Sequence, residues 1–266
     1  MDLLVIIGYI SSVLIGISLG LIGGGGSILT VPVLVYLIGV DPVTATAYSL
    51  FVVGASSSVG SINYFKKGLV NLKTAGIFGL PAILSVYSTR KFLVPLIPEQ
   101  LFTIDSFIFT KEMGVMVLFA VLMIAASISM IRGRKEAHQE ETKQEFNYAL
   151  ILLEGVLVGV LTGLVGAGGG FLIIPALVVL SKLPMKQAIG TSLLIIAAKS
   201  LIGFLGDISN REIDWTFLLI FTSISIIGIF IGSALSNKIS GAKLKPAFGW
   251  FVLLMGIFIL TKSLIN

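Results

Sequence analysis

A glycine-rich stretch that interrupts an apolar run occurs twice in the chain. Residues 20–27 read Gly-Leu-Ile-Gly-Gly-Gly-Gly-Ser, and residues 163–170 read Gly-Leu-Val-Gly-Ala-Gly-Gly-Gly. The agreement continues beyond these stretches, because 13 of the 31 residues from 20 to 50 are identical to the residue 143 positions later. An ungapped match of this length indicates that the two halves of the chain are copies of one unit.

The composition places both copies in a membrane. Of the 266 residues, 56% are apolar and 12% are charged, and the mean hydropathy is +1.07. Soluble domains are about 25% charged, so a soluble fold of this size would lack the polar residues to cover its surface. A cytosolic enzyme, a disordered chain and a nucleic-acid-binding domain are therefore excluded, despite the net charge of +5. Cysteine is absent, so disulfides and thiolate sites are excluded as well.

The apolar runs predict an all-α membrane protein. A membrane-spanning helix needs roughly 20 apolar residues, and a transmembrane barrel would alternate apolar and polar residues, which these runs do not. Eight runs are long enough to span, and two that follow the glycines are shorter, at 27–38 and 170–181. We interpret the first long run as a retained helix rather than a signal peptide. The long runs are 3–22, 43–65, 72–89, 113–131, 148–166, 187–206, 215–236 and 247–264.

A polar segment separates the two halves. Residues 132–147 are rich in Lys, Arg and Glu and are expected to form a solvated linker. His138, the single histidine, lies there beside carboxylates, and we interpret it as a solvated residue rather than a metal ligand. The predicted organisation is a first membrane repeat over 1–131, the linker, and a second membrane repeat over 148–266.

The distribution of positive charge favours inverted repeats. If each glycine segment returns the chain to the side it came from, twelve Lys and Arg residues gather on one face and five on the other, with Lys199 inside a helix. Parallel repeats would divide them nine to eight. The positive-inside rule favours the first arrangement, which puts the linker in the cytoplasm of a prokaryotic cell and both termini outside the inner membrane. The five outer residues would be Arg90, Lys91, Lys111, Arg211 and Lys262.

Both short helices are predicted to start at the glycines. The first N–H groups of a helix lack intrahelical partners and carry partial positive charge, and glycine leaves them open to a ligand. Inverted copies would bring both starts towards the middle of the membrane, which predicts a site for a small anion. Close packing of helices is the alternative. The candidate residues are Gly23, Gly24, Gly25, Gly26, Ser27, Gly166, Gly168, Gly169 and Gly170.

Hydroxyl groups follow each glycine cluster at equivalent positions. Tyr48 and Ser49 in the first copy correspond to Thr191 and Ser192 in the second. Hydroxyls can donate hydrogen bonds to an oxyanion without adding charge, so these four are further candidates. The alternative is that they bond to carbonyls of their own helix.

These residues together resemble the TauE/SafE family of sulfite and organosulfonate exporters. The resemblance rests on the paired glycine motifs, on Pro32 and Pro175 nine residues after Gly23 and Gly166, and on an Ala-x-x-x-Ser pattern at residues 45–49 and 188–192. It covers both halves. It implies a permease that moves small sulfur oxyanions out of the cytoplasm, with no cofactor and no metal.

Charged residues inside the apolar runs are candidates for function, because charge is costly in a membrane. Lys199 is hypothesised to add a positive charge to the anion pathway. An ion pair with Glu154 and snorkelling to the interface are the alternatives. Glu154 is also a candidate for proton coupling. Asp207, beside Arg211, is interpreted as part of a solvated outer loop.

The function predicted is secondary transport of a small anion, sulfite or an organosulfonate such as sulfoacetate, by alternating access. An anion channel and a non-transporting assembly subunit are the alternatives. A membrane enzyme is disfavoured because the apolar runs hold no histidine and no metal-spaced carboxylates. The expected partners are the anion and membrane lipid, with a homo-oligomer left open and no nucleic acid.

Overall fold

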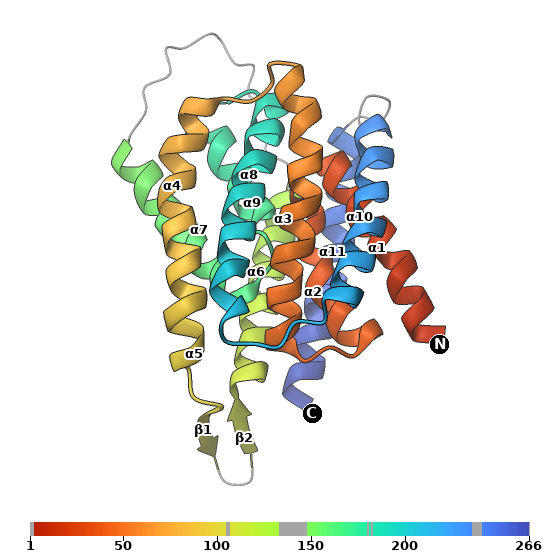
Figure 1. The fold of residues 1–266 in the computed structure, drawn as a ribbon, viewed down its shortest axis with the longest axis vertical. Helices are drawn as coiled ribbons and strands as arrows, with labels where there is room; N and C mark the ends of the chain where they lie inside the picture. Colours follow the sequence, from red (N-terminus) through yellow and green to blue (C-terminus); the bar gives the residue numbers. More distant parts are fainter. Residues whose placement is uncertain are drawn as a thin grey trace.

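The computed structural model describes residues 3–104, 107–132, 148–179, 181, 183–235 and 241–265. Within these ranges the chain forms a bundle whose long helices run mostly along one axis (Figure 1). Eight long helices match the eight predicted runs. They are α1 (Leu3–Ile22), α3 (Pro42–Lys66), α4 (Leu72–Ser88), α6 (Lys111–Ile131), α7 (Tyr148–Val165), α9 (Met185–Ile208), α10 (Trp215–Leu235) and α11 (Gly241–Ile265).

The helices have the length and surface of membrane spans. In the described part of the chain, six are long and apolar enough to cross a membrane, and shorter apolar segments at Ala149–Val165 and Gly249–Leu264 belong to α7 and α11. Large apolar side chains point outward from the bundle: Leu84 is 68% exposed, Leu254 65% and Phe230 62%. Such a surface is unfavourable in water and suits hydrocarbon, so the all-α membrane fold is confirmed.

The two short segments also form helices. The first is a continuous series of a 3₁₀ turn η1 (Gly25–Leu29), α2 (Thr30–Val33) and a π turn η2 (Leu34–Ile38), and it begins two residues before the predicted run. The second is α8 (Gly170–Val179), which begins at the predicted residue. The two segments therefore differ in helix type although their sequences align.

The bundle has two distinct ends. At the linker end, α3 stops, α4 starts and α6 stops (Figure 1). Residues 133–147 of the predicted linker, which include His138, are not among the described residues. At the other end, which we call the hairpin end, α1 begins, α11 stops, and α4 continues through the π turn η3 (Thr89–Leu93) and α5 (Val94–Leu96). There a short hairpin, not predicted from sequence, pairs β1 (Gln100–Ile104) with β2 (Phe107–Thr110), and the rings of Phe102 and Phe109 stack.

The helices pack mainly across the two halves of the chain. Helix α1 packs on α10, α4 on α7, α3 on α9 and α6 on α11. Glycines allow the closest of these contacts: a methyl group added at Gly16 would come within 2.9 Å of the Gly228 Cα atom. The short helices lie against the α3–α9 pair on one side and contribute Ile28 and Phe171 to a core with α6 and α11 on the other.

Candidate functional site

Left-handed glycines at equivalent positions end the helices that precede the two glycine clusters. Gly23 follows α1 with a φ of 77°, and Gly166 follows α7 with a φ of 71°. Each donates its N–H group to a carbonyl four residues earlier, that of Leu19 or Thr162, at 2.8 Å. Helices commonly end in this way, with a left-handed residue, and glycine adopts that conformation without steric cost. Both helices therefore end at a glycine, at positions of the two halves that are 143 residues apart.

The two glycine clusters lie against each other. A methyl group added at Gly170 would come within 2.2 Å of the Gly24 Cα atom, and one added at Gly24 would come within 2.5 Å of the Gly170 Cα atom. Gly168 is similarly close to Ser27, at 3.2 Å between the added carbon and the Ser27 Cβ atom. The structure thus brings together backbone segments about half a chain apart, with no side chain between them.

The contact lies midway along the two central helices. An added methyl at Gly24 would meet Ile196 at 2.8 Å, and one at Gly168 would meet Val53 at 2.5 Å. Val53 and Ile196 each occupy the middle of their helix, α3 and α9 respectively. Irregular backbone at this depth is tolerated only where it is packed in protein or lines a cavity.

Lys199 is fully buried beside the second cluster. Its Nζ atom donates a hydrogen bond of 2.7 Å to the Thr162 hydroxyl, and a methyl added at Gly169 would lie 2.8 Å from this nitrogen. The alternative ion pair with Glu154 is not formed: in the described ranges, the partner of Lys199 is Thr162, and the Glu154 Oε2 atom is buried without a hydrogen-bond partner. The Lys199 amino group therefore lies at the second glycine cluster.

The serine hydroxyls of the candidate site are used in different ways. Ser27 donates to the Gly24 carbonyl at 2.7 Å, and Ser192 donates to the Ile189 carbonyl at 2.8 Å, as the back-bonding alternative describes. The Ser49 hydroxyl is buried and has no hydrogen-bond partner among the described residues. Ser49 is thus the one of the three that retains an unused buried donor.

Tyr48 and Thr191 join the two halves. The Tyr48 hydroxyl accepts a hydrogen bond of 2.8 Å from the backbone N–H of Asp214, just before α10. The Thr191 hydroxyl accepts one of 2.9 Å from the backbone N–H of Asn71, just before α4. The two bonds are equivalent and run in opposite directions between the halves, and both are made to backbone outside the glycine clusters.

Sequence reasoning missed two polar features of the interior. Thr162, the partner of Lys199, lies one turn before Gly166, and a hydroxyl so near the helix break was the available signal. Ser57 and Ser200 occupy equivalent positions of α3 and α9, and both hydroxyls are buried without hydrogen-bond partners in the part of the chain that the structure describes. Their spacing of 143 residues was visible in the sequence.

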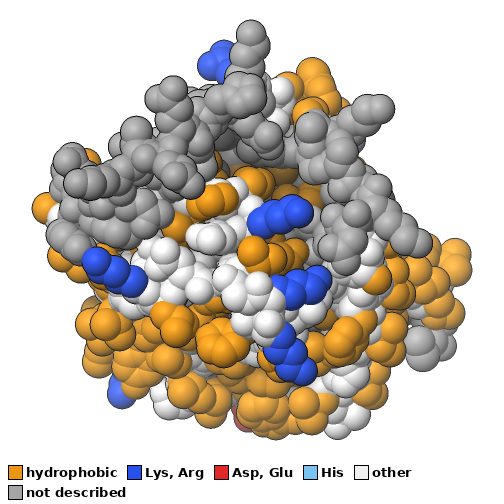
Figure 2. Space-filling view, turned by 90° about the horizontal axis from the view of Figure 1, so that it is seen from above, with side chains coloured by type: hydrophobic (Ala, Val, Ile, Leu, Met, Phe, Trp, Pro, Cys, Tyr) orange, Lys and Arg blue, Asp and Glu red, His pale blue; other side chains and the backbone are white. Residues whose placement is uncertain are grey.

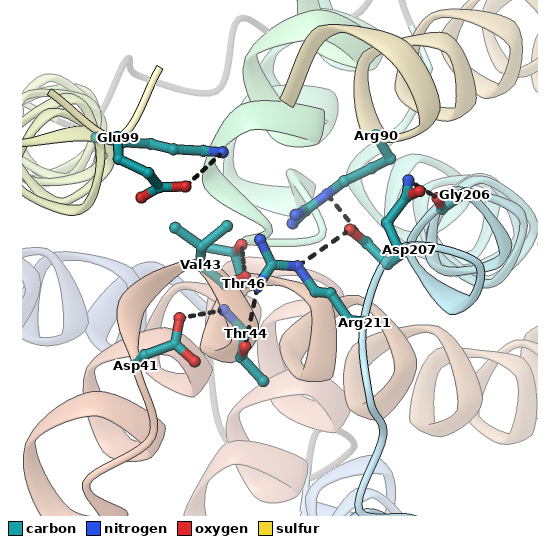
Figure 3. A network of polar contacts seen from close by, with 11 residues as sticks. Asp41, Val43, Thr44, Thr46, Arg90, Glu99, Gly206, Asp207 and Arg211 are labelled. Atoms are coloured by element: carbon teal, nitrogen blue, oxygen red, sulfur yellow. Dashed lines mark hydrogen bonds and ion pairs between the residues drawn. The ribbon is translucent and has the colours of Figure 1, made fainter. Parts of the chain in front are cut away.

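The prediction for Asp207 was wrong. It is 2% exposed and lies within α9, where it pairs with Arg90 at 3.4 Å and with Arg211 at 4.0 Å (Figure 3). Arg90, assigned to the outer face from sequence, is completely buried at the hairpin end. The predicted outer loop therefore begins after the end of α9, at residue 209.

The chain is similar in sequence to known proteins. Residues 9–259 match the family described as "Sulfite exporter TauE/SafE". A "Probable membrane transporter protein" of Xylella fastidiosa is 33% identical over 98% of this chain and 96% of its own length. The "Probable membrane transporter protein YdhB" of Bacillus subtilis is 26% identical, over 93% and 96%. No solved structure matches the chain.

Proposed function

Because the chain belongs to the sulfite exporter TauE/SafE family of multi-pass membrane transporters, we propose that it exports a small sulfur oxyanion, sulfite or an organosulfonate such as sulfoacetate. The observation that carries the proposal is the direct contact of the two glycine clusters midway along α3 and α9, with the buried ammonium of Lys199 beside them. Helix starts with backbone N–H groups and one buried basic side chain, away from water, suit a small anion.

In this proposal, backbone groups and a few side chains share the binding of the anion. The N–H groups at the starts of η1 and α8 contribute partial positive charge. Lys199 contributes a positive charge when it is protonated, and its ammonium then carries further N–H donors besides the one given to Thr162. The Ser49 hydroxyl, buried without a hydrogen-bond partner among the described residues, would be a donor from the first repeat.

We propose that the anion moves by alternating access between two inverted repeats. Two features support this. Equivalent helices exchange partners, since α1 packs on α10 as α7 packs on α4. Equivalent hydroxyls also make equivalent bonds across the halves, from Asp214 to Tyr48 and from Asn71 to Thr191. A repeat that rocks against its partner around the glycine contact would open the site to each side in turn.

The proposed orientation puts the linker end in the cytoplasm. Exposed Lys and Arg side chains gather at this end of the bundle (Figure 2). Those described there are Lys66, Lys67, Lys73, Arg132 and Lys186. Basic residues next to membrane helices favour the cytoplasmic side, so the hairpin end and both termini would face outward. Export would then run from the linker end to the hairpin end.

Glu154 is proposed as a residue that couples transport to protons. It lies in α7, it is half-buried, and its Oε2 atom has no hydrogen-bond partner among the described residues. A carboxyl group without a partner in a membrane helix can gain or lose a proton without breaking an ion pair or hydrogen bond. A Glu154→Gln variant should then transport sulfite at a rate that no longer responds to a pH gradient, while the wild-type rate does respond.

The central test is transport by purified protein in liposomes. Wild-type protein should exchange labelled sulfite saturably and without single-channel current, and sulfoacetate should compete. Lys199→Met removes the buried charge and should lower the rate, whereas Lys91→Met removes an exposed charge and should leave it unchanged. Single-channel current would establish a channel instead. Absence of both transport and binding would favour an assembly subunit.

A further inference from the structure

A buried cationic cluster at the hairpin end has unused hydrogen-bond donors. Arg90 lies in η3 and is completely buried, and its Nε atom is 3.4 Å from the Asp207 Oδ2 atom. None of its three guanidinium nitrogens has a hydrogen-bond partner among the described residues. Gly206 makes room for this side chain, because a methyl added there would come within 3.0 Å of the Arg90 Cβ atom.

Arg90 shares its carboxylate partner with a second arginine. Arg90 and Arg211 both reach towards the one carboxylate of Asp207 (Figure 3), and the Nε atom of Arg211 is 4.0 Å from Asp207 Oδ1. Arg211 is 23% exposed and can be solvated, whereas Arg90 is completely buried. A buried charge whose pairing is incomplete is destabilising. In the described part of the chain, the pairing with Asp207 thus leaves guanidinium N–H donors of Arg90 without an acceptor.

The cluster adjoins the second glycine segment. A methyl added at Gly163 would lie 2.8 Å from the Cβ atom of Thr89, the residue before Arg90. One added at Gly166 would lie 2.3 Å from the Thr46 carbonyl oxygen, and Arg211 donates a bond of 3.1 Å to the nearby Thr44 hydroxyl. An anion that leaves the glycine clusters towards the hairpin end would thus approach Arg90.

We infer that Arg90 is a second binding position for the transported oxyanion, at which the anion displaces the carboxylate of Asp207. This inference rests on the proposed function for the identity of the anion. A guanidinium group binds a planar or pyramidal oxyanion through two parallel N–H bonds, which its single long contact with Asp207 does not satisfy. When the anion is absent, the Asp207 carboxylate forms the ion pair with Arg90. Its competition keeps the affinity low enough for the anion to leave.

The test measures sulfite binding to purified protein by calorimetry, with sodium sulfite as the probe. Arg90→Gln should weaken binding about tenfold to a hundredfold, the range for a hydrogen bond to a charged group. Asp207→Asn removes the competitor and should tighten binding by a similar factor, while release and hence turnover in liposomes slow down. Lys91→Gln, which removes the adjacent exposed charge, should bind as the wild type does.

A double variant separates binding from folding. Arg90→Gln with Asp207→Asn leaves no unpaired charge of this pair buried, so it should fold better than either single variant, yet it should bind sulfite as weakly as Arg90→Gln. Wild-type affinity in the double variant would overturn the inference and leave a purely structural ion pair. Failure of the wild-type protein to bind sulfite would instead contradict the proposed function.

Discussion

Replacing Gly170 by alanine tests whether the contact between the glycine clusters is needed for transport. The added methyl group would lie 2.2 Å from Gly24 Cα and 2.6 Å from the Gly24 carbonyl carbon and oxygen, whereas ordinary contacts begin at 3.4 Å. All three atoms are backbone, so no side chain can turn aside. The two clusters would have to separate by about 1.2 Å, the difference between 2.2 and 3.4 Å.

The expected cost follows from this displacement. Overpacking a well-packed interior costs about 1–3 kcal/mol, so the variant should unfold at a lower temperature. A shift of about 1 Å can cost a catalytic site about a hundredfold, and we expect sulfite exchange in liposomes to fall at least about tenfold. Gly76→Ala is the matched control, because nothing lies within 4 Å of the added carbon in α4 and alanine favours the helix by up to about 1 kcal/mol.

Two results would refute this reasoning. If Gly170→Ala unfolds and transports as the wild type does, the clusters are not in the contact described. If it unfolds at a lower temperature but transports at the wild-type rate, the glycines serve packing only, and the anion site lies elsewhere. A loss of transport in Gly76→Ala as well would show that the assay responds to any change in a span.

Two further variants test the packing across the halves and a third tests a helix cap, all by thermal unfolding in detergent. Gly228→Ala would bring a methyl within 2.2 Å of the Val13 carbonyl oxygen and should lower stability by about 1–3 kcal/mol; no change would contradict the α1–α10 contact. Tyr48→Phe removes the acceptor of the Asp214 N–H group and should cost about 1 kcal/mol, and an unchanged melting temperature would mean that water replaces the hydroxyl. Asp41→Ala removes the N-cap of α3 and should cost about 1 kcal/mol, with Asp41→Asn as the control that retains the cap.

The helices and their interruptions could be predicted because they depend on local composition. A run of apolar residues of sufficient length forms a span wherever it is placed in a membrane. Gly23 and Gly166 end their helices because of their own conformational freedom, which no distant residue needs to supply. The hairpin at residues 100–110 was missed because two short apolar strands do not differ in composition from the ends of the neighbouring spans.

The membrane class, the eight long helices, the two breaks and the family could therefore be predicted from the residues alone. Which polar groups meet depends on tertiary packing. Lys199 bonds Thr162, 37 residues away, rather than Glu154, and Tyr48 bonds Asp214 across 166 residues. Arg90 is buried against Asp207 although both looked like flanking charges. Hydropathy indicates which segments lie within the membrane. The packing of α4 on α7 and α9 determines which residues Arg90 and its neighbours contact.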